Sequence, residues 1–458
     1  MKSLLILAAL ATAAGAEQGV ASSSKVAATA SAPRIDFSTF TLPNGLRVIL
    51  SRDASVPVAA MTMIVDVGGR HETPGRSGFA HLFEHVMFEG SRHVPKGGFD
   101  KMLESYGGDN NASTHEDFTF YYEEVPSNAL PVAVWLDADR VGALSVLPES
   151  VKNQIEVVKE EKRMRVDNEP YGSLLYVDMG SRTFSNWQNS HPTIGSFADL
   201  DAASLKDVRA FFEAYYSPDN IIMAIVGDID LAETRRLVEG YFGPIPAKAR
   251  PKRADVTEPA PAGERTVKVS DDHAKLPALG FTWKGGPERG SEDYYALVLL
   301  GKALFAGKSA RLYQNLVKRA QVAVSLDGGL GFPLSDADEY KAPGAFGGFV
   351  AHKRDKTSAE IKTLVEAEIA DAAKNGLTDA ELERVKTKFR SDWLRGQETR
   401  LGRAQRLLYA ALLDGDPEAA NGELARFMAV TPAQIKTAAA RLAPAAATWF
   451  ELSAGGAE

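Results

Sequence analysis

The stretch GFAHLFEHVMFEGS, residues 78 to 91, places two histidines four residues apart, with a glutamate directly before the second. Most of its other residues are apolar, and their spacing predicts a helix with a buried face. On such a helix His81 and His85 lie one turn apart on the same side, as two imidazoles must to bind one metal ion. Glu84 borders that side, where its carboxylate can contact a water beside the metal without being a ligand. The order HxxEH is the reverse of HExxH and indicates the same chemistry, two histidine ligands and a general base.

These three residues have a second interpretation, which is a solvated helix face or a satisfied polar network in the core. Their immediate neighbours are apolar, namely Phe79, Leu82, Phe83, Val86, Met87 and Phe88. Charge among such neighbours costs free energy unless a partner compensates it, which favours a metal. The chain has no cysteine, so a metal site here must be built from histidine, aspartate and glutamate.

Length and charge narrow the class of protein. A chain of 458 residues exceeds one ordinary domain, and we expect two, each with its own core. The net charge of -8, without any run of Lys and Arg interleaved with aromatic residues, gives no surface for nucleic acid. The sequence therefore predicts an enzyme or a binding protein that does not act on nucleic acid.

The N-terminus MKSLLILAALATAAGAEQ has one basic residue, an apolar run and then the small residues Ala14, Gly15 and Ala16. This order is typical of a secretory signal peptide, so we expect residues 1–16 to be removed. A buried first helix is the alternative, but a flexible Ser/Ala-rich segment, residues 17–34, follows directly. The apolar run is too short to span a bilayer. We therefore predict an exported, periplasmic bacterial protein without a stable membrane anchor.

Strand and helix patterns alternate irregularly along the chain. Asn44-Gly45 between two apolar runs is a strong hairpin signal, and three further strands are predicted at 58–69, 117–125 and 220–229. Long helical patterns cover 127–143, 148–166 and 203–216. Because strands and helices do not alternate regularly, an α+β fold is expected, with mostly antiparallel sheets packed against helices.

A segment rich in Pro, Ala and charge, residues 244–265, has no hydrophobic period and is predicted to be a linker. It separates a first domain, residues 35–243, from a second domain, residues 266–458. The pattern of strands followed by long helices begins again after the linker. The chain is therefore predicted to contain two homologous domains.

A shift of 217 residues makes this repeat visible, because it places Gly68-Gly69 on Gly285-Gly286 and Phe88 on Phe305 within similar helical patterns. Chance pairing of glycine and phenylalanine is the alternative explanation. In this register the positions of His81, Glu84 and His85 are taken by Val298, Gly301 and Lys302. Only the first domain is expected to bind a metal.

A second predicted helix, in NQIEVVKEEKRMRVDNEPYG (153–172), supplies candidates for a third ligand. With HxxEH upstream, this stretch resembles the pitrilysin and mitochondrial processing peptidase family of zinc metallopeptidases, the inverzincins. The resemblance extends through PNGLRVIL, GGRHE, GGDNNASTHEDFTFYYEEVP and YYSPDNIIMAIVGDI in the first half, and more loosely through ARLYQNLVKRAQVAVSL in the second. It implies a zinc-dependent metalloendopeptidase whose two homologous domains together form half of a clamshell.

By this resemblance the ligands of one Zn²⁺ per chain are His81, His85 and Glu161, with Glu84 as the base that activates water. Glu160 is the alternative third ligand. Neighbouring residues point about 100° apart on a helix, so only one of these two glutamates can face the ion. Two histidines and one carboxylate leave a fourth position for water, as in catalytic zinc sites.

The resemblance also implies a substrate-binding edge strand at Asn111 and Ala112, where an extended peptide would add as a further strand. A plain loop at these residues is the alternative. Seven residues before its ligand glutamate the family often carries another glutamate that supports the site. This chain has Gln154 there, which can form hydrogen bonds but carries no charge.

A larger departure lies in the second half, where active members carry an Arg and, seven residues later, a Tyr that stabilise the oxyanion. This chain has Val317 and Val324 at those positions, unless Lys318 or Arg319 substitutes. The loss of one oxyanion donor typically lowers the rate by about 100- to 1000-fold. We therefore expect a heterodimer, in which a homologous partner without HxxEH supplies the Arg and the Tyr. The alternative is a non-catalytic peptide-binding or assembly subunit of the same fold.

Overall fold

The computed structural model describes residues 33–341 and 343–455. The predicted signal peptide, 1–16, lies outside the described residues, as does nearly all of the segment 17–34. None of the described helices has both the length and the apolar character that crossing a membrane requires.

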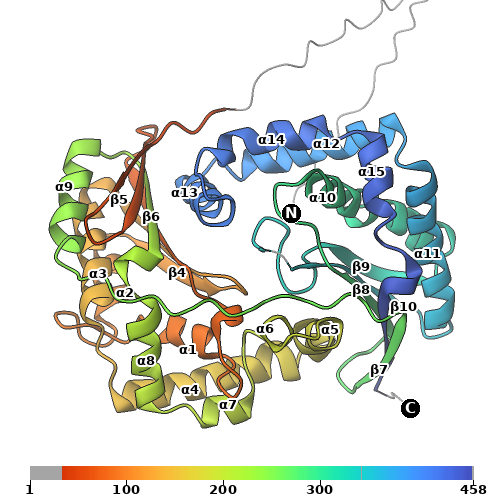
Figure 1. The fold of residues 1–458 in the computed structure, drawn as a ribbon, viewed down its shortest axis with the longest axis horizontal. Helices are drawn as coiled ribbons and strands as arrows, with labels where there is room; N and C mark the ends of the chain where they lie inside the picture. Colours follow the sequence, from red (N-terminus) through yellow and green to blue (C-terminus); the bar gives the residue numbers. More distant parts are fainter. Residues whose placement is uncertain (1–32, 342, 456–458) are drawn as a thin grey trace, which may run out of the picture. The chain divides into compact units, whose positions relative to one another are not determined.

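The first domain is built on a six-stranded sheet in the order β1-β2-β6-β3-β5-β4 (Figure 1). Its strands are β1 (Ser38–Thr41), β2 (Arg47–Arg52), β3 (Val58–Val65), β4 (Asp109–Thr114), β5 (Thr119–Pro126) and β6 (Ile221–Gly227). Strands β2 and β6 are parallel, and the other neighbours are antiparallel. Every residue of β6 is buried, as its continuous apolar sequence predicts for a central strand.

The second domain is built on a five-stranded sheet in the order β7-β11-β8-β10-β9. Its strands are β7 (Arg265–Asp271), β8 (Ala278–Lys284), β9 (Ala323–Leu330), β10 (Ala345–His352) and β11 (Ala447–Ala454). Strands β7 and β11 are parallel and the rest antiparallel. Without β1, the first sheet has the same order and the same directions, so β2, β6, β3, β5 and β4 correspond to β7, β11, β8, β10 and β9. This shared topology confirms the predicted α+β fold of two homologous domains.

Helices follow β3 and β5 in the first half, and they follow the corresponding strands β8 and β10 in the second half. The first half contains α1 (Phe79–Val86), α2 (Gly98–Ser105), α3 (Leu130–Ala143), α4 (Pro148–Lys162), α5 (Met179–Thr183), α6 (Trp187–Ser190), α7 (Phe197–Asp201), α8 (Leu205–Tyr215) and α9 (Leu231–Phe242). The second contains α10 (Glu292–Phe305), α11 (Ser358–Asn375), α12 (Asp379–Arg395), α13 (Arg400–Tyr409), α14 (Ala419–Ala429) and α15 (Pro432–Ala439). Between α9 and β7 the structure has neither helix nor strand, in the interval of the predicted linker. The domain boundaries themselves stay predictions.

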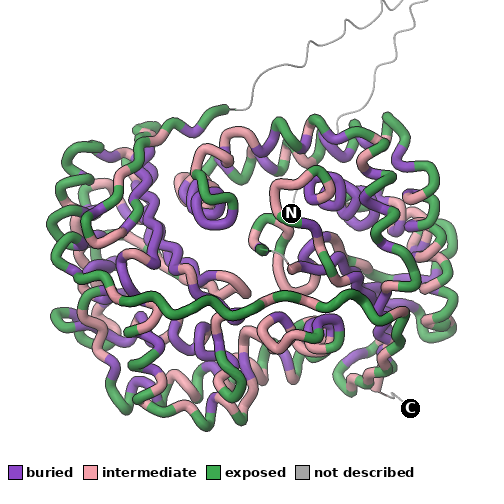
Figure 2. Tube along the Cα trace, in the orientation of Figure 1, coloured by how far each residue is buried: buried purple, intermediate pink, exposed green. Residues whose placement is uncertain are grey.

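Each half contributes a helix to the sheet of the other. Leu407 and Leu408 of α13 pack with Ile64 and Ile222 on one face of the first sheet. In the opposite direction, Met179 at the start of α5 packs with Phe450 on a face of the second sheet. Figure 2 shows the resulting buried segments in both sheets. Burial of apolar area stabilises such contacts by roughly 25 cal/mol per Å², so the two domains share cores instead of meeting only at a polar surface.

Candidate metal centre

Helix α1 buries its apolar side and leaves its polar side toward a second helix. Phe79, Leu82 and Phe83 are almost fully buried in the first core. The helix begins after Gly78, whose φ of 85° is in the left-handed region. A Cβ on Gly78 would also lie 2.9 Å from a backbone atom of Gly195. Glycine is therefore needed at this position for the helix to start where it does.

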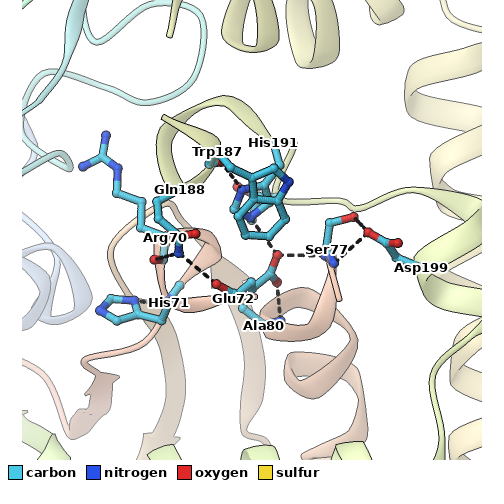
Figure 3. Close-up of polar contacts among 12 residues, drawn as sticks. Arg70, His71, Glu72, Ser77, Ala80, Trp187, Gln188, His191 and Asp199 are labelled. Carbon is cyan, nitrogen blue, oxygen red and sulfur yellow. Dashed lines mark hydrogen bonds and ion pairs between the residues drawn. The ribbon is translucent and has the colours of Figure 1, made fainter. Parts of the chain in front are cut away.

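The start of α1 is held by a buried glutamate, Glu72 (Figure 3). Its carboxylate accepts hydrogen bonds from the backbone N–H groups of Gly78, at 2.9 Å, and Ala80, at 2.7 Å. Oε2, the oxygen that accepts from Gly78, also lies 2.9 Å from Nε2 of His191, whose ring stacks on that of Trp187 with 3.7 Å between ring centres. Burial raises the pKa of Glu72, and the contact with His191 opposes this shift. A carboxylate at this place accepts hydrogen bonds from free N–H groups of the helix, and it interacts favourably with the positive N-terminal end of the helix dipole.

We expect Glu72→Gln to lower the free energy of unfolding by about 1–3 kcal/mol. The NH₂ group of the glutamine would face a backbone N–H that now donates to the carboxylate, and two donors cannot bond each other. Thermal or denaturant unfolding measures this. Glu104→Gln, at an exposed position near the end of α2, is the matched control and should leave stability unchanged. Equal stability of the two variants would show that Glu72 does not hold α1.

The structure brings His81, His85 and Glu161 together. Nε2 of His81 and Nε2 of His85 are 3.3 Å apart, and Oε2 of Glu161 lies 3.6 Å and 3.4 Å from them. With metal–ligand bonds of about 2.0 to 2.1 Å, two ligand atoms of a tetrahedral zinc are about 3.3 Å apart. The three atoms therefore fit three corners of a zinc tetrahedron. In residues 33–341 and 343–455, no other group of three such side chains is as close.

The two adjacent glutamates of α4 point in different directions, as the helix geometry requires. The side chain of Glu161 is 16% exposed, and its Oε1 lies 3.1 Å from NH1 of Arg165. The side chain of Glu160 is 58% exposed and pairs with Arg163 instead. Only Glu161 lies with the two histidines.

Gln154 and Glu89 orient the ring of His85. Nδ1 of His85 lies 3.2 Å from Oε1 of Gln154. The amide of Gln154 donates from Nε2 to Oε1 of Glu89 at 2.5 Å, and this bond leaves the amide oxygen toward the ring. Nδ1 must then carry the proton, and Nε2 keeps its lone pair toward the site. Glu89, which also pairs with Lys96 at 2.6 Å, thus places its negative charge beyond Gln154. A glutamate at position 154 would instead place a charge directly beside His85.

Burial also sets the protonation of the site. It lowers the pKa of His81 to about 4, so this imidazole is neutral near pH 7, as a metal ligand must be. Contact with the His85 ring lowers the pKa of Glu161, which is therefore a carboxylate. Burial raises the pKa of Glu84, while a hydrogen bond from Thr114 opposes the shift.

Asn111 and Ala112 lie in β4, which among the described strands pairs with β5 alone and is therefore at the edge of the first sheet. The backbone N–H of Ala112 donates to Oδ1 of Asn111 at 2.8 Å, so this donor faces away from the ladder. On the same strand, the hydroxyl of Thr114 donates to Oε2 of Glu84 at 2.5 Å. The open edge thus leads directly to Glu84.

Val317 and Val324 lie in the second domain. Val317 packs against the second core and Val324 is 53% exposed on β9. Neither side chain can donate a hydrogen bond. Lys318, the nearest cation in sequence, lies with its ammonium 5.9 Å from the ring centre of Tyr313.

Sequence reasoning missed Glu72, His191, Glu89 and Thr114. All four hold α1 or orient its side chains. Most of the contacts involved join distant parts of the chain, and Glu72 and His191, for example, are 119 residues apart in sequence. One signal was present, because Glu72 ends the quoted stretch GGRHE, shortly before the metal helix begins at Phe79. A glutamate just upstream of a predicted helix could have been examined as a helix cap.

Comparison with known proteins agrees with the fold and shows the family. Residues 47–195 match the family described as Insulinase (Peptidase family M16), and residues 202–389 match the Peptidase M16 inactive domain. The zinc protease PqqE of Helicobacter pylori is 31% identical over 78% of this chain and 80% of its own. An uncharacterized zinc protease of Streptomyces coelicolor is 26% identical over 87% of this chain and 85% of its own. The chain belongs to peptidase family M16.

Solved structures show the same two-domain fold. A protease from Helicobacter pylori aligns with a TM-score of 0.84 and 26% identity, over 92% of this chain and 99% of that one. A peptidase M16 inactive domain from Pseudomonas fluorescens aligns with a TM-score of 0.80 and 18% identity, over 92% and 98%. The periplasmic protease PqqL of Escherichia coli has a TM-score of 0.72 and 20% identity, and the aligned region covers 93% of this chain but 48% of that one.

Proposed function

We propose that the chain is a zinc-dependent metalloendopeptidase that hydrolyses peptides or unfolded polypeptide segments. The observation that carries the proposal is the arrangement of His81, His85 and Glu161, whose three ligand atoms fit zinc and leave a fourth position open. The names of the relatives as zinc proteases support the same metal.

A zinc ion held there supplies Lewis-acid activation of water and of a peptide carbonyl. Glu84 takes the proton from the attacking water with its Oε atoms and then gives it to the leaving amine. Thr114 fixes the rotamer of Glu84 through its hydrogen bond to Oε2. The pKa of Glu84 is raised by burial, which brings this carboxyl group closer to the range in which it can both accept and return a proton.

The substrate is proposed to bind as an added strand at the edge of β4. Ala112 would offer its outward N–H to a substrate carbonyl once the side chain of Asn111 moves away. Strand addition uses the backbone of the substrate, which suits peptides of many sequences.

The oxyanion donors are proposed to come from a homologous partner subunit without HxxEH, because Val317 and Val324 cannot supply them. The chain aligns with 48% of PqqL, which is the size relation expected if a one-chain relative joins two such halves. The N-terminal sequence 1–16 supports export to the periplasm. The match of residues 202–389 to an inactive domain favours a second candidate, a peptide-binding subunit without catalysis.

The test uses the mature chain loaded with zinc, assayed on a mixed peptide library alone and after mixing with a homologous, HxxEH-less subunit that carries Arg and Tyr. We expect one bound zinc per chain, weak cleavage alone, and at least about 100-fold faster cleavage in the mixture, since two oxyanion donors are restored. Chelation should abolish both activities and added zinc should restore them. Full activity of a homodimer would exclude the heterodimer, and bound zinc without cleavage in any mixture would favour the binding subunit.

A further inference from the structure

Helices α10 and α12 occupy in the second domain the places that α1 and α4 occupy in the first. Helix α10 follows β8 as α1 follows β3, and α12 is the second helix after β10 as α4 is after β5. Val298 and Lys302 of α10 therefore replace His81 and His85 by the repeat register. Asp392 of α12 stands at the same distance from the helix start as Glu161 of α4.

A cavity of about 570 Å³ lies at this counterpart of the metal site. Val298 and Lys302 line it from α10, Asp392 and Trp393 line it from α12, and Phe427 lines it from α14. This volume is within the range of pockets that bind small organic ligands, about 300–1,000 Å³. The second domain thus has no histidine ligands at these positions of α10, but it has a cavity between the corresponding two helices.

The cavity has an apolar wall and charged groups at its rim. Val298, Phe389, Trp393 and Phe427 form the wall. Two of the charged pairs are already satisfied within the chain, because Arg406 bonds Glu423 and Lys388 bonds Asp392, each at 2.7 Å.

Lys302 and Asp336 differ from these pairs. Among the described residues, neither side chain forms an ion pair or a hydrogen bond, although both line the cavity. Lys302, Asp336 and Asp338 are exposed to solvent at the rim, and the side chain of Asp338 also forms no ion pair or hydrogen bond among the described residues. A cation on one side and two carboxylates on the other, above an aromatic wall, match a ligand that carries both charges and an apolar body.

We propose that this cavity binds a short apolar peptide in its zwitterionic form. The carboxylate of the ligand pairs with Lys302, its ammonium pairs with Asp336, and its side chains pack against Trp393 and Phe389. A peptidase would produce such molecules, but the binding itself needs neither zinc nor cleavage.

The test measures binding of the dipeptide Leu-Phe to the full chain by calorimetry in the presence of a chelator. Lys302→Met should weaken binding at least about 10-fold, since it removes a charge-assisted bond. Lys374→Met, at an exposed lysine of α11 that does not line the cavity, is the matched control and should bind as the unmodified chain does. The amide Leu-Phe-NH₂ should bind weakly and equally to the unmodified chain and to Lys302→Met, because it has no carboxylate for Lys302.

A second pair of variants locates the ligand. Val298→Trp fills the cavity and should abolish binding, whereas His85→Gln, at the metal centre, should leave binding unchanged. Absence of Leu-Phe binding to the unmodified chain would overturn the proposal. So would loss of binding in His85→Gln, which would place the dipeptide in the first domain. Because no arm depends on cleavage, these outcomes are independent of the proposed peptidase activity.

Discussion

Glu84→Gln should lower peptide cleavage by about 100- to 10,000-fold while zinc remains bound at one ion per chain. The reason is that the side chain amide can accept the hydrogen bond of Thr114 but cannot take a proton from water. The ligand atoms of His81, His85 and Glu161 are untouched by this change. Zinc content and single-turnover cleavage, measured on the same preparation with the partner subunit present, check both parts of the expectation.

Glu156→Gln is the control for this variant, because Glu156 is a 60% exposed glutamate on the helix that carries Glu161. It should cleave at the normal rate. If Glu84→Gln kept more than a tenth of the activity, the proton would pass through another group. If the variant lost its zinc, Glu84 would be a ligand and its assignment as the base would be wrong.

The first domain shows what local sequence can predict about this molecule. Asn44-Gly45 predicted the β1–β2 hairpin, and the continuous apolar run of β6 predicted a buried strand, because both signals are contained in a few neighbouring residues. The repeat was also visible, but the shared order of the two sheets supports it much more strongly than matched glycines do.

Contacts between distant segments explain what the sequence did not predict. The apolar face of α13 identifies an amphipathic helix, but nothing in its period says that it covers the sheet of the first domain instead of its own. In the same way, the sequence predicts that Gln154 can form hydrogen bonds but does not identify their partners. Glu89, which orients its amide, lies 65 residues away and became relevant only when the fold placed the two together.

Helix geometry alone shows that one of Glu160 and Glu161 faces the metal, but not which one. In the sequence only the family resemblance favours Glu161. Glu161→Gln should weaken zinc binding by more than about 100-fold, since even the loss of a residue that supports a ligand commonly costs 10- to 100-fold. Glu160→Gln changes the adjacent carboxylate, which is 58% exposed and faces Arg163, and should bind zinc normally. Competition against a chromogenic chelator measures both affinities. The opposite result would be weak binding in Glu160→Gln and normal binding in Glu161→Gln. It would mean that α4 rotates by one residue about its axis when the metal is bound. The tetrahedral fit of His81, His85 and Glu161 would then not describe the zinc site.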